Sequence, residues 1–188
     1  MTTISICTLA HGREDHLRNL VSGLNHSQRP PCELVVAVMQ DHRYDLPSTS
    51  FPVRQILLGD KGICLAEARN TAAREARGDL LIFLDVDCIP APRLVEDYAV
   101  AAAFNEGVLM GEVGYLPKGA TDRGIDYAVF ERLAVKHADR AGPPRGMVGK
   151  CGDYRCFWSL NFALQAATFR AIGGFDPRYV GYGGEDTD

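Results

Sequence analysis

Apolar residues along the chain follow two alternating patterns. Short apolar or β-branched runs predict strands at 4–9, 34–39, 53–58 and 80–84. Between and after these runs, apolar residues recur at helical spacing and predict helices over 17–24, 65–76 and 94–102. The run at 80–84 is apolar throughout, as expected for a strand buried on both faces. The alternation predicts an α/β sandwich around a mainly parallel sheet.

The second half of the chain has a different composition and a weaker apolar pattern. After a further strand expected at 108–113, residues 117–157 hold glycine, proline and charge around one helical stripe of Ile125, Val129 and Leu133. We interpret this segment as an excursion over the surface, serving as a lid or an acceptor segment. The apolar pattern then returns with a strand at 160–164 and a short helix ending at Gly173-Gly174. No linker divides the chain, so we expect a single domain over residues 1–188.

Charge and composition narrow the class of protein. The chain has a hydrophobic content of 46% and a net charge of -4, without a basic run, which argues against a nucleic-acid partner. Its start lacks the pattern of a secretory signal, and no apolar run reaches membrane-spanning length. We therefore expect a cytoplasmic protein without a transmembrane segment, and leave open a peripheral association with the inner face of the membrane.

Two acids follow the most apolar strand directly, in the sequence Asp85-Val86-Asp87. Ligands of open α/β sheets bind beyond the carboxyl ends of the strands, so these carboxylates lie where a site is expected. Two carboxylates suit a hard divalent cation that bridges to a diphosphate. The alternative is an acidic turn in which an aspartate caps the next helix.

A second acidic segment lies near the end of the chain. Gly173-Gly174-Phe175-Asp176 is followed by a glycine-rich stretch over 181–188 that contains Glu185 and Asp186. Glycines allow a tight backbone path beside a ligand, and neighbouring acids can supply a base and an acceptor for sugar hydroxyls. The alternative is a solvated acidic turn.

Taken in order, these motifs resemble those of the family 2 GT-A glycosyltransferases. The series comprises Ala68-Arg69-Asn70, Gly78-Asp79, Leu84-Asp85-Val86-Asp87, Gly173-Gly174-Phe175-Asp176 and Gly183-Gly184-Glu185-Asp186. The last stretch is similar to the galactosyltransferase-like branch. The resemblance covers nearly the whole chain and implies a GT-A, Rossmann-like sandwich. It also implies transfer from a nucleotide-diphospho-sugar, with a UDP-sugar favoured, to a carbohydrate or glycolipid acceptor.

The resemblance assigns a role to several donor-side residues. Asp87 would ligate Mn²⁺ or Mg²⁺ at the diphosphate, and Asp85 would contact the ribose or the metal through water. Arg69 would lie near the nucleotide or its phosphates, the alternative being a surface arginine on a helix. Asn70 would either join Arg69 there or hold a loop through hydrogen bonds to the backbone.

The base of the nucleotide would be cradled at the ends of the first two strands. By resemblance, Ala10, His11 and Asp41 are the candidates. The sequence departs from the family pattern here, because 38–40 is Val-Met-Gln where acids are common, and Asp41 follows one or two positions late. His11 would stack on a base or bind phosphate, or else be a loop histidine without a role.

The acceptor side is assigned in the same way. Asp186 would be the general base for direct displacement with inversion, Glu185 would orient the acceptor, and Gly184 would line its site. Trp158, the only tryptophan, would form a platform for a sugar ring, the alternative being ordinary core packing.

Two alternatives to an active transferase stay open. The chain stops at Asp188, directly after the acidic motif, whereas related enzymes continue and some supply a histidine metal ligand there. We therefore expect a domain truncated at its C-terminus, for which a nucleotide-sugar binding module without catalysis is the alternative. A haloacid-dehalogenase-like phosphatase also uses Asp-x-Asp with Mg²⁺, but there a Thr or Val stands where this chain has Ile89, and the motif lies near the start of the fold.

Overall fold

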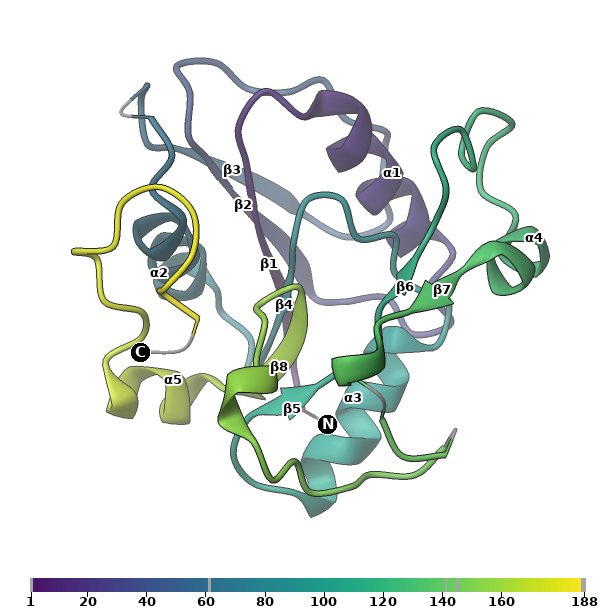
Figure 1. Ribbon diagram of the computed structural model, residues 1–188. Coiled ribbons are helices and arrows are strands. Elements are labelled where there is room, and N and C mark those ends of the chain that lie inside the picture. Colours follow the sequence, from purple (N-terminus) through teal and green to yellow (C-terminus); the bar gives the residue numbers. More distant parts are fainter. Residues whose placement is uncertain (1, 61, 141, 145, 187–188) are drawn as a thin grey trace.

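A mixed sheet forms the centre of the molecule (Figure 1). The computed structural model describes residues 2–60, 62–140, 142–144 and 146–186. Within these residues six strands pair in the order β3-β2-β1-β4-β8-β5. The strands are β1 (Ile4–Ala10), β2 (Glu33–Val38), β3 (Val53–Leu57), β4 (Leu80–Leu84), β5 (Leu109–Met110) and β8 (Asn161–Gln165). Strands β1 to β4 are parallel, and β8 runs antiparallel to both β4 and β5.

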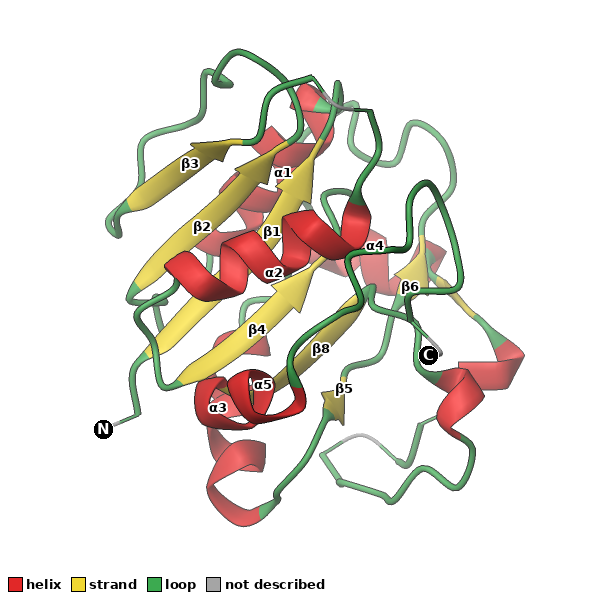
Figure 2. Cartoon of the chain, turned by 90° about the vertical axis from the view of Figure 1, so that its left-hand side faces the viewer, coloured by secondary structure: helices red, strands yellow, loops and turns green. Residues whose placement is uncertain are grey.

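Helices cover both faces of the sheet (Figure 2). One face packs against α1 (Glu14–Asn25) and α3 (Leu94–Phe104), the other against α2 (Leu65–Glu75) and α5 (Ala166–Ile172). On the second face the rings of Phe83 and Phe162 stack with centroids 4.5 Å apart, which joins β4 to β8. The result is the three-layer sandwich expected when both faces of a largely parallel sheet are apolar.

The strands and helices predicted in the first hundred residues are present, each within three residues of its expected ends. Two elements differ from expectation later in the chain. The strand expected at 108–113 is only Leu109–Met110, and the helix of the excursion, α4 (Tyr127–Leu133), buries Phe130 while Leu133 is exposed. The excursion also holds the hairpin of β6 (Gly114–Tyr115) and β7 (Val135–Lys136), with 3₁₀ turns at Ala138–Arg140 and Tyr154–Cys156.

The carboxyl ends of the four parallel strands lie at the same edge of the sheet, as the arrowheads in Figure 2 show. The antiparallel direction of β8 brings its first residues to that edge as well, since Leu84 pairs with Asn161 and Asp85 N donates to Leu160 O at 3.0 Å. Gly181 reaches the edge too, where its N–H donates to Ile63 O at 3.0 Å. Segments from most of the chain thus meet at one place.

Candidate active site

A pocket of about 240 Å³ opens at this edge. Its wall is built from the segments that follow β1, β2 and β4, from the start of α2 and Ile63 before it, from Ser159 before β8 and from the glycine-rich acidic stretch. One part of the wall is apolar and is formed by Leu9, Met39, Ile63 and Leu65. Another part carries carboxylates, those of Asp85, Asp87, Glu185 and Asp186.

Arg69 links the acids of the two motifs. Its side chain is only 4% exposed, and its guanidinium donates from Nη2 to Asp85 Oδ1 at 3.1 Å and from Nη1 to Glu185 Oε1 at 3.0 Å. Asp186 Oδ1 lies 3.8 Å from Nη1. A residue of α2 therefore sets the distance between the acids after β4 and the acids 100 residues later in the chain, and its burial excludes the surface arginine considered from the sequence.

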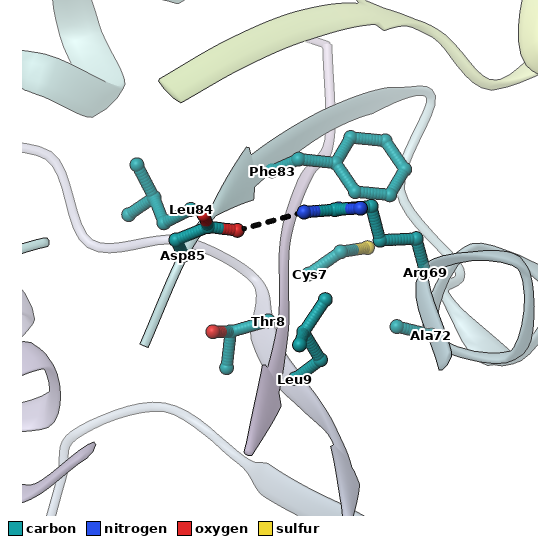
Figure 3. Close-up of a pocket in the computed structure, with 8 residues that line it drawn as sticks. All are labelled: Cys7, Thr8, Leu9, Arg69, Ala72, Phe83, Leu84 and Asp85. Atoms are coloured by element: carbon teal, nitrogen blue, oxygen red, sulfur yellow. Dashed lines mark hydrogen bonds and ion pairs between the residues drawn. The ribbon is translucent and has the colours of Figure 1, made fainter. Parts of the chain in front are cut away.

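The ion pair of Arg69 with Asp85 lies between a closed gap on one side and the open pocket on the other. Figure 3 shows the guanidinium crossing from α2 toward Asp85, beside the Phe83 ring and above Cys7. The gap between these residues leaves no room for a water molecule. Coulombic attraction is stronger where water is excluded, so this pair is firmly held.

Burial also acts on the protonation of Asp85. It raises the pKa of this carboxyl, and the nearby charges of Asp87 and Asp186 raise the pKa further, while Arg69 opposes the shift. Several carboxylates in one small volume thus repel one another. Such a group favours a positively charged ligand or hydroxyl donors in the pocket.

Glu185 and Asp186 each have one oxygen held by a hydrogen bond and one oxygen that accepts no hydrogen bond from the described residues. Glu185 Oε1 accepts from Arg69, and Asp186 Oδ2 accepts from Ser159 N at 3.2 Å. Glu185 Oε2 and Asp186 Oδ1 are buried and have no hydrogen-bond partner among the described residues. A buried acceptor without a donor is costly, so these two oxygens are suited to accept hydroxyl groups of a ligand.

Asp87 is the more exposed acid of the Asp85-Val86-Asp87 turn. Its Oδ2 accepts from Arg13 Nη1 at 3.1 Å, and both side chains are 46% exposed. Among the described residues the second oxygens of Asp85 and Asp87 have no side-chain partner. Two carboxylates with an oxygen each to spare fit the donor chemistry of Mg²⁺ or Mn²⁺. No described group of three His, Cys, Asp or Glu side chains forms a complete set of ligands, so the remaining ligands would come from substrate and water.

The chain from Gly173 to Gly181, which leads into the glycine-rich acidic stretch, is fixed to the α2 layer at two points. Asn70 donates to Phe175 O at 2.7 Å and accepts from Phe175 N at 2.9 Å, so its side chain holds the loop, one of the two roles expected for it. Gly174 lies in the left-handed region at φ 74°, and a Cβ there would stand 2.5 Å from Asn70 Oδ1. Farther along, Gly181 forms a β-bridge with Cys64. Thr187 and Asp188, which end the predicted segment, lie outside the described residues.

The structure brings some predicted site residues into the pocket wall and leaves others outside it. His11, Arg69, Asp85, Asp87, Glu185 and Asp186 line the pocket. Ala10 and Asp41 are not in the wall: Ala10 is buried in β1, and Asp41 Oδ1 accepts from Asp60 N at 3.1 Å. Trp158 and Gly184 also lie outside the wall, each next to a residue that lines it.

Trp158 packs against two basic side chains of the excursion. The Arg140 guanidinium carbon lies 5.5 Å from its ring centroid, and the His137 ring lies edge-on at 4.9 Å. The indole is half-buried, and these contacts agree with packing, whereas the role as a platform for a sugar ring stays a prediction.

Gln40 lies two residues after β2, in the stretch where the family pattern has acids. Both its amide oxygen and its amide nitrogen form hydrogen bonds. Its Oε1 accepts from Gly12 N at 3.2 Å and from Tyr44 Oη at 2.9 Å, and its Nε2 donates to His42 O at 3.2 Å. The glutamine therefore fastens the loop after β1 to the loop after β2. Met39, its neighbour, takes the place in the pocket wall.

Sequence reasoning gave some residues of the wall no role of their own and missed others. Arg13 and Met39 line the pocket and belong to the strand-end stretches 9–13 and 39–41 expected to cradle the base, but neither was singled out. Ile63 and Ser159 line it as well and were missed. The only available signal for Arg13 was a cation in the loop that follows the first strand, at the edge where ligands bind. Ser159 gave no signal, because its place depends on the direction of β8.

Comparison with known proteins identifies the family. Residues 5–121 match the sequence model of glycosyl transferase family 2. The chain belongs to this family. Residues 148–188 match a second model, the N-terminal domain of galactosyltransferase, and this segment contains both Ser159 and the glycine-rich acids. Family 2 membership also excludes the phosphatase alternative.

Curated relatives and solved structures agree with this assignment. Validoxylamine A glucosyltransferases of two Streptomyces hygroscopicus subspecies, jinggangensis and limoneus, are 28% identical over 164 residues, which is 72% of this chain but 36% and 34% of those proteins. The chain thus spans about a third of the length of the curated relatives that it matches.

Two solved structures show the fold. The mannosyltransferase PcManGT from Pyrobaculum calidifontis, in complex with GDP-Man and Mn²⁺, aligns with a TM-score of 0.57 and 16% identity, covering 99% of this chain and 50% of that one. S. aureus TarS in complex with UDP aligns with a TM-score of 0.65 and 15% identity, covering 98% and 53%. This family 2 chain therefore has the GT-A fold. Among the residues that the structure describes, none of the helices has the length and apolar character to cross a membrane.

Proposed function

We propose that this chain transfers a sugar from a nucleotide-diphospho-sugar, preferably a UDP-sugar, to a hydroxyl group of a carbohydrate or glycolipid acceptor, with inversion. The observation that carries the proposal is the division of one pocket into an apolar part and a carboxylate part, with Arg69 holding the acids of both motifs together. A donor of this kind has the same division, since its base is flat and its diphosphate end is charged.

The apolar part of the pocket is suited to the base. Met39, Ile63 and Leu65 offer apolar surface on which a planar ring can pack, and Leu9 lies beside them. The base seat proposed here replaces the cradle expected at Ala10 and Asp41, which lie outside the wall. Among proteins of this fold, one solved structure holds GDP-Man and another holds UDP.

The diphosphate would lie toward Asp85 and Asp87. These two carboxylates would hold a divalent cation, which when bound supplies positive charge beside the diphosphate as it leaves. The cation in the PcManGT complex is Mn²⁺, which supports Mn²⁺ as the first ion to test.

Asp186 would act as the general base. Its Oδ2 is fixed by the Ser159 N–H, and its buried Oδ1 has no hydrogen-bond partner among the described residues, so it can accept a proton from an acceptor hydroxyl. Glu185 Oε2 is also buried and has no hydrogen-bond partner among the described residues. It would accept a hydrogen bond from a second hydroxyl and so orient the acceptor. Trp158, next to Ser159, would add a platform for the sugar ring.

The transfer is then a single displacement. As the acceptor hydroxyl proton passes to Asp186, the oxygen forms a bond to the anomeric carbon, and the bond from that carbon to the diphosphate oxygen breaks. The electron pair of the broken bond leaves with the nucleoside diphosphate. Attack from the side opposite the leaving group inverts the anomeric configuration.

Titration calorimetry with UDP and GDP, with and without Mn²⁺, tests the donor site, and release of nucleotide from UDP- and GDP-hexoses tests turnover. Asp87→Ala should abolish Mn²⁺-dependent nucleotide binding. Asp186→Asn should keep that binding within about twofold and lower turnover by about 10²–10⁴-fold, as expected for loss of a general base. Asp45→Asn, at a side chain that is 97% exposed, is the matched control and should change neither.

Three outcomes would contradict the proposal. If neither nucleotide bound, the interpretation of the pocket as a donor site would be wrong. Binding without turnover by the wild-type chain would indicate a nucleotide-sugar binding module. Full turnover by Asp186→Asn would remove this residue from the role of base.

A further inference from the structure

Arg13 and Asp87 form an ion pair in the pocket wall, although 74 positions separate them. Arg13 follows β1 and precedes α1, whereas Asp87 follows β4. Their contact at 3.1 Å exists because β1 and β4 are neighbours whose carboxyl ends lie together. The pair therefore spans the edge of the pocket, and its acid, Asp87, is one of the two carboxylates proposed to bind the cation.

This ion pair differs from that of the other arginine in the wall. Arg69 is 4% exposed and is fixed by carboxylates on two sides, whereas Arg13 and Asp87 are each 46% exposed. Ion pairs in solvent contribute about 0.2–1 kcal/mol, so the Arg13–Asp87 contact is cheap to break. Arg13 can thus change partner while Arg69 stays in place.

Arg13 also has hydrogen-bonding capacity to spare. A guanidinium has about five N–H donors in a planar fork. Among the described residues only Nη1 of Arg13 has a side-chain partner, the Asp87 carboxylate. A fork of this kind matches the geometry of phosphate oxygens and binds them more tightly than neutral acceptors.

We propose that Arg13 binds the phosphates of the donor, and that without donor it holds Asp87 in the place of the cation. The inference rests on the proposed function, because it takes a diphosphate and a divalent cation as the ligands. When both enter, Asp87 exchanges the guanidinium for the cation, and Arg13 turns its N–H groups to the phosphate oxygens. Two cationic partners thereby bind the same carboxylate in succession, and Arg13 exchanges one anionic partner for another.

The exchange predicts binding changes of opposite sign in Arg13→Gln. With Mn²⁺ alone, followed by the electron paramagnetic resonance of the free ion, affinity should rise by about 1.4- to 5-fold, because a competing partner is removed. With UDP or inorganic pyrophosphate at Mn²⁺ concentrations that saturate both proteins, followed by calorimetry, affinity should fall by about tenfold or more, because a charged hydrogen bond to phosphate is lost. Uridine, which lacks phosphate, should bind as to the wild type.

Two further variants make the test specific. Arg18→Gln is the matched control. Arg18 is 42% exposed and pairs with Glu14 and Asp45, but it lies outside the pocket wall. Its replacement should change neither the Mn²⁺ affinity nor the pyrophosphate affinity. Arg13→Lys keeps the charge without the planar fork and should restore pyrophosphate binding only in part.

The outcomes separate this inference from the proposed function. An unchanged or lowered Mn²⁺ affinity in Arg13→Gln would overturn the exchange, and unchanged pyrophosphate affinity would overturn the phosphate contact. If the wild type bound pyrophosphate but neither UDP nor GDP, the proposed function would fail, and the Arg13 assignment would stand or fall on the pyrophosphate and Mn²⁺ results.

Discussion

Arg69 is a cation buried among three carboxylates that come from two distant parts of the chain. Its bonds to Asp85 and Glu185 measure 3.1 and 3.0 Å, and its guanidinium also lies 5.3 Å from the ring centroid of Phe175. A buried charge is strongly destabilising unless it is paired. Removing one partner of this network therefore leaves the remaining buried charges uncompensated. At the scale of the residue, the same contacts that arrange the acids also stabilise the fold.

Replacement of Arg69 by glutamine should therefore lower the free energy of unfolding. We expect a loss of about 3–5 kcal/mol at neutral pH, because Asp85 and Glu185 would lose their counter-charge. Urea unfolding of the variant and of the wild type measures the difference, with Arg18→Gln as the exposed control. A loss below about 1 kcal/mol, the range of a surface pair, would mean that the network contributes little to stability.

The acids of the pocket were predictable from the sequence, but their partners were not. Asp85 and Asp87 follow an apolar strand directly, and Glu185 and Asp186 follow a run of glycines, so each pair carries a local signal. The Arg13 contact to Asp87 depends on which strands are neighbours. Strand order is a property of the assembled sheet, and hydrophobic periodicity does not encode it.

At the scale of elements, Glu33 joins four parts of the sandwich at the start of β2. Its Oε1 accepts from Ser5 Oγ of β1 at 2.8 Å and from Arg77 N in the turn after α2 at 2.6 Å, and its Oε2 accepts from Arg54 Nη1 of β3 at 3.2 Å. Burial on its own would raise the pKa of Glu33, but these hydrogen bonds outweigh burial and lower it from the usual 4.5.

A lowered pKa in the folded state gives Glu33 a stability contribution that depends on pH. The contribution is fully present above about pH 4.5 and is lost as the pH falls through the folded-state pKa, because protonation then favours the unfolded chain. Glu33→Gln should be about 1–3 kcal/mol less stable than the wild type at pH 7, with a difference that shrinks below pH 4.5. Thermal unfolding of both proteins from pH 7 to pH 3 tests this, and a constant difference would show that Glu33 does not act through its charge.

The strands were predictable individually, whereas their directions and some of their lengths were not. The apolar runs at 80–84 and 160–164 look alike in the sequence, yet β8 runs antiparallel beside β4. Directly after β5, Gly111 packs so closely against the side chains of Asn161 and Tyr98 that a Cβ would lie 2.3 Å from Asn161 Nδ2. Such close approaches depend on residues far apart in the chain, so no local sequence pattern predicts them.

At the scale of the whole molecule, the excursion over 117–157 is joined to the sandwich through its helix and through its ends, where the centroid of the Phe157 ring lies 5.0 Å from that of Phe162. Tyr127 Oη donates to Pro90 O at 2.9 Å, Phe130 is buried, and Arg140 donates to the carbonyls of Gly111 and Trp158. Its remaining large apolar side chains are mostly exposed, among them Val135, Met147 and Val148. We propose that this segment acts as a lid that closes over the donor and keeps out water.

Limited digestion with trypsin should cleave the chain first within this segment. Lys118, Arg123 and Lys150 are exposed on loops and turns, which are the preferred sites of proteolytic cleavage. UDP together with Mn²⁺ should slow these cuts several-fold if the segment closes over the donor, as measured by mass spectrometry of the fragments. An unchanged cleavage rate at saturating UDP and Mn²⁺ would contradict a lid.

The two ends of the excursion are held together by the sheet itself, since Gly111 N donates to Asn161 O at 3.0 Å where β5 meets β8. A loop with fixed ends tolerates changes of length, because doubling it costs only about 0.6 kcal/mol of closure entropy. Insertions and deletions between these strands are therefore nearly neutral for folding. In the course of evolution this junction would let descendants of the chain exchange the proposed lid beside Trp158 while the sheet and the strand ends that carry the pocket are inherited unchanged.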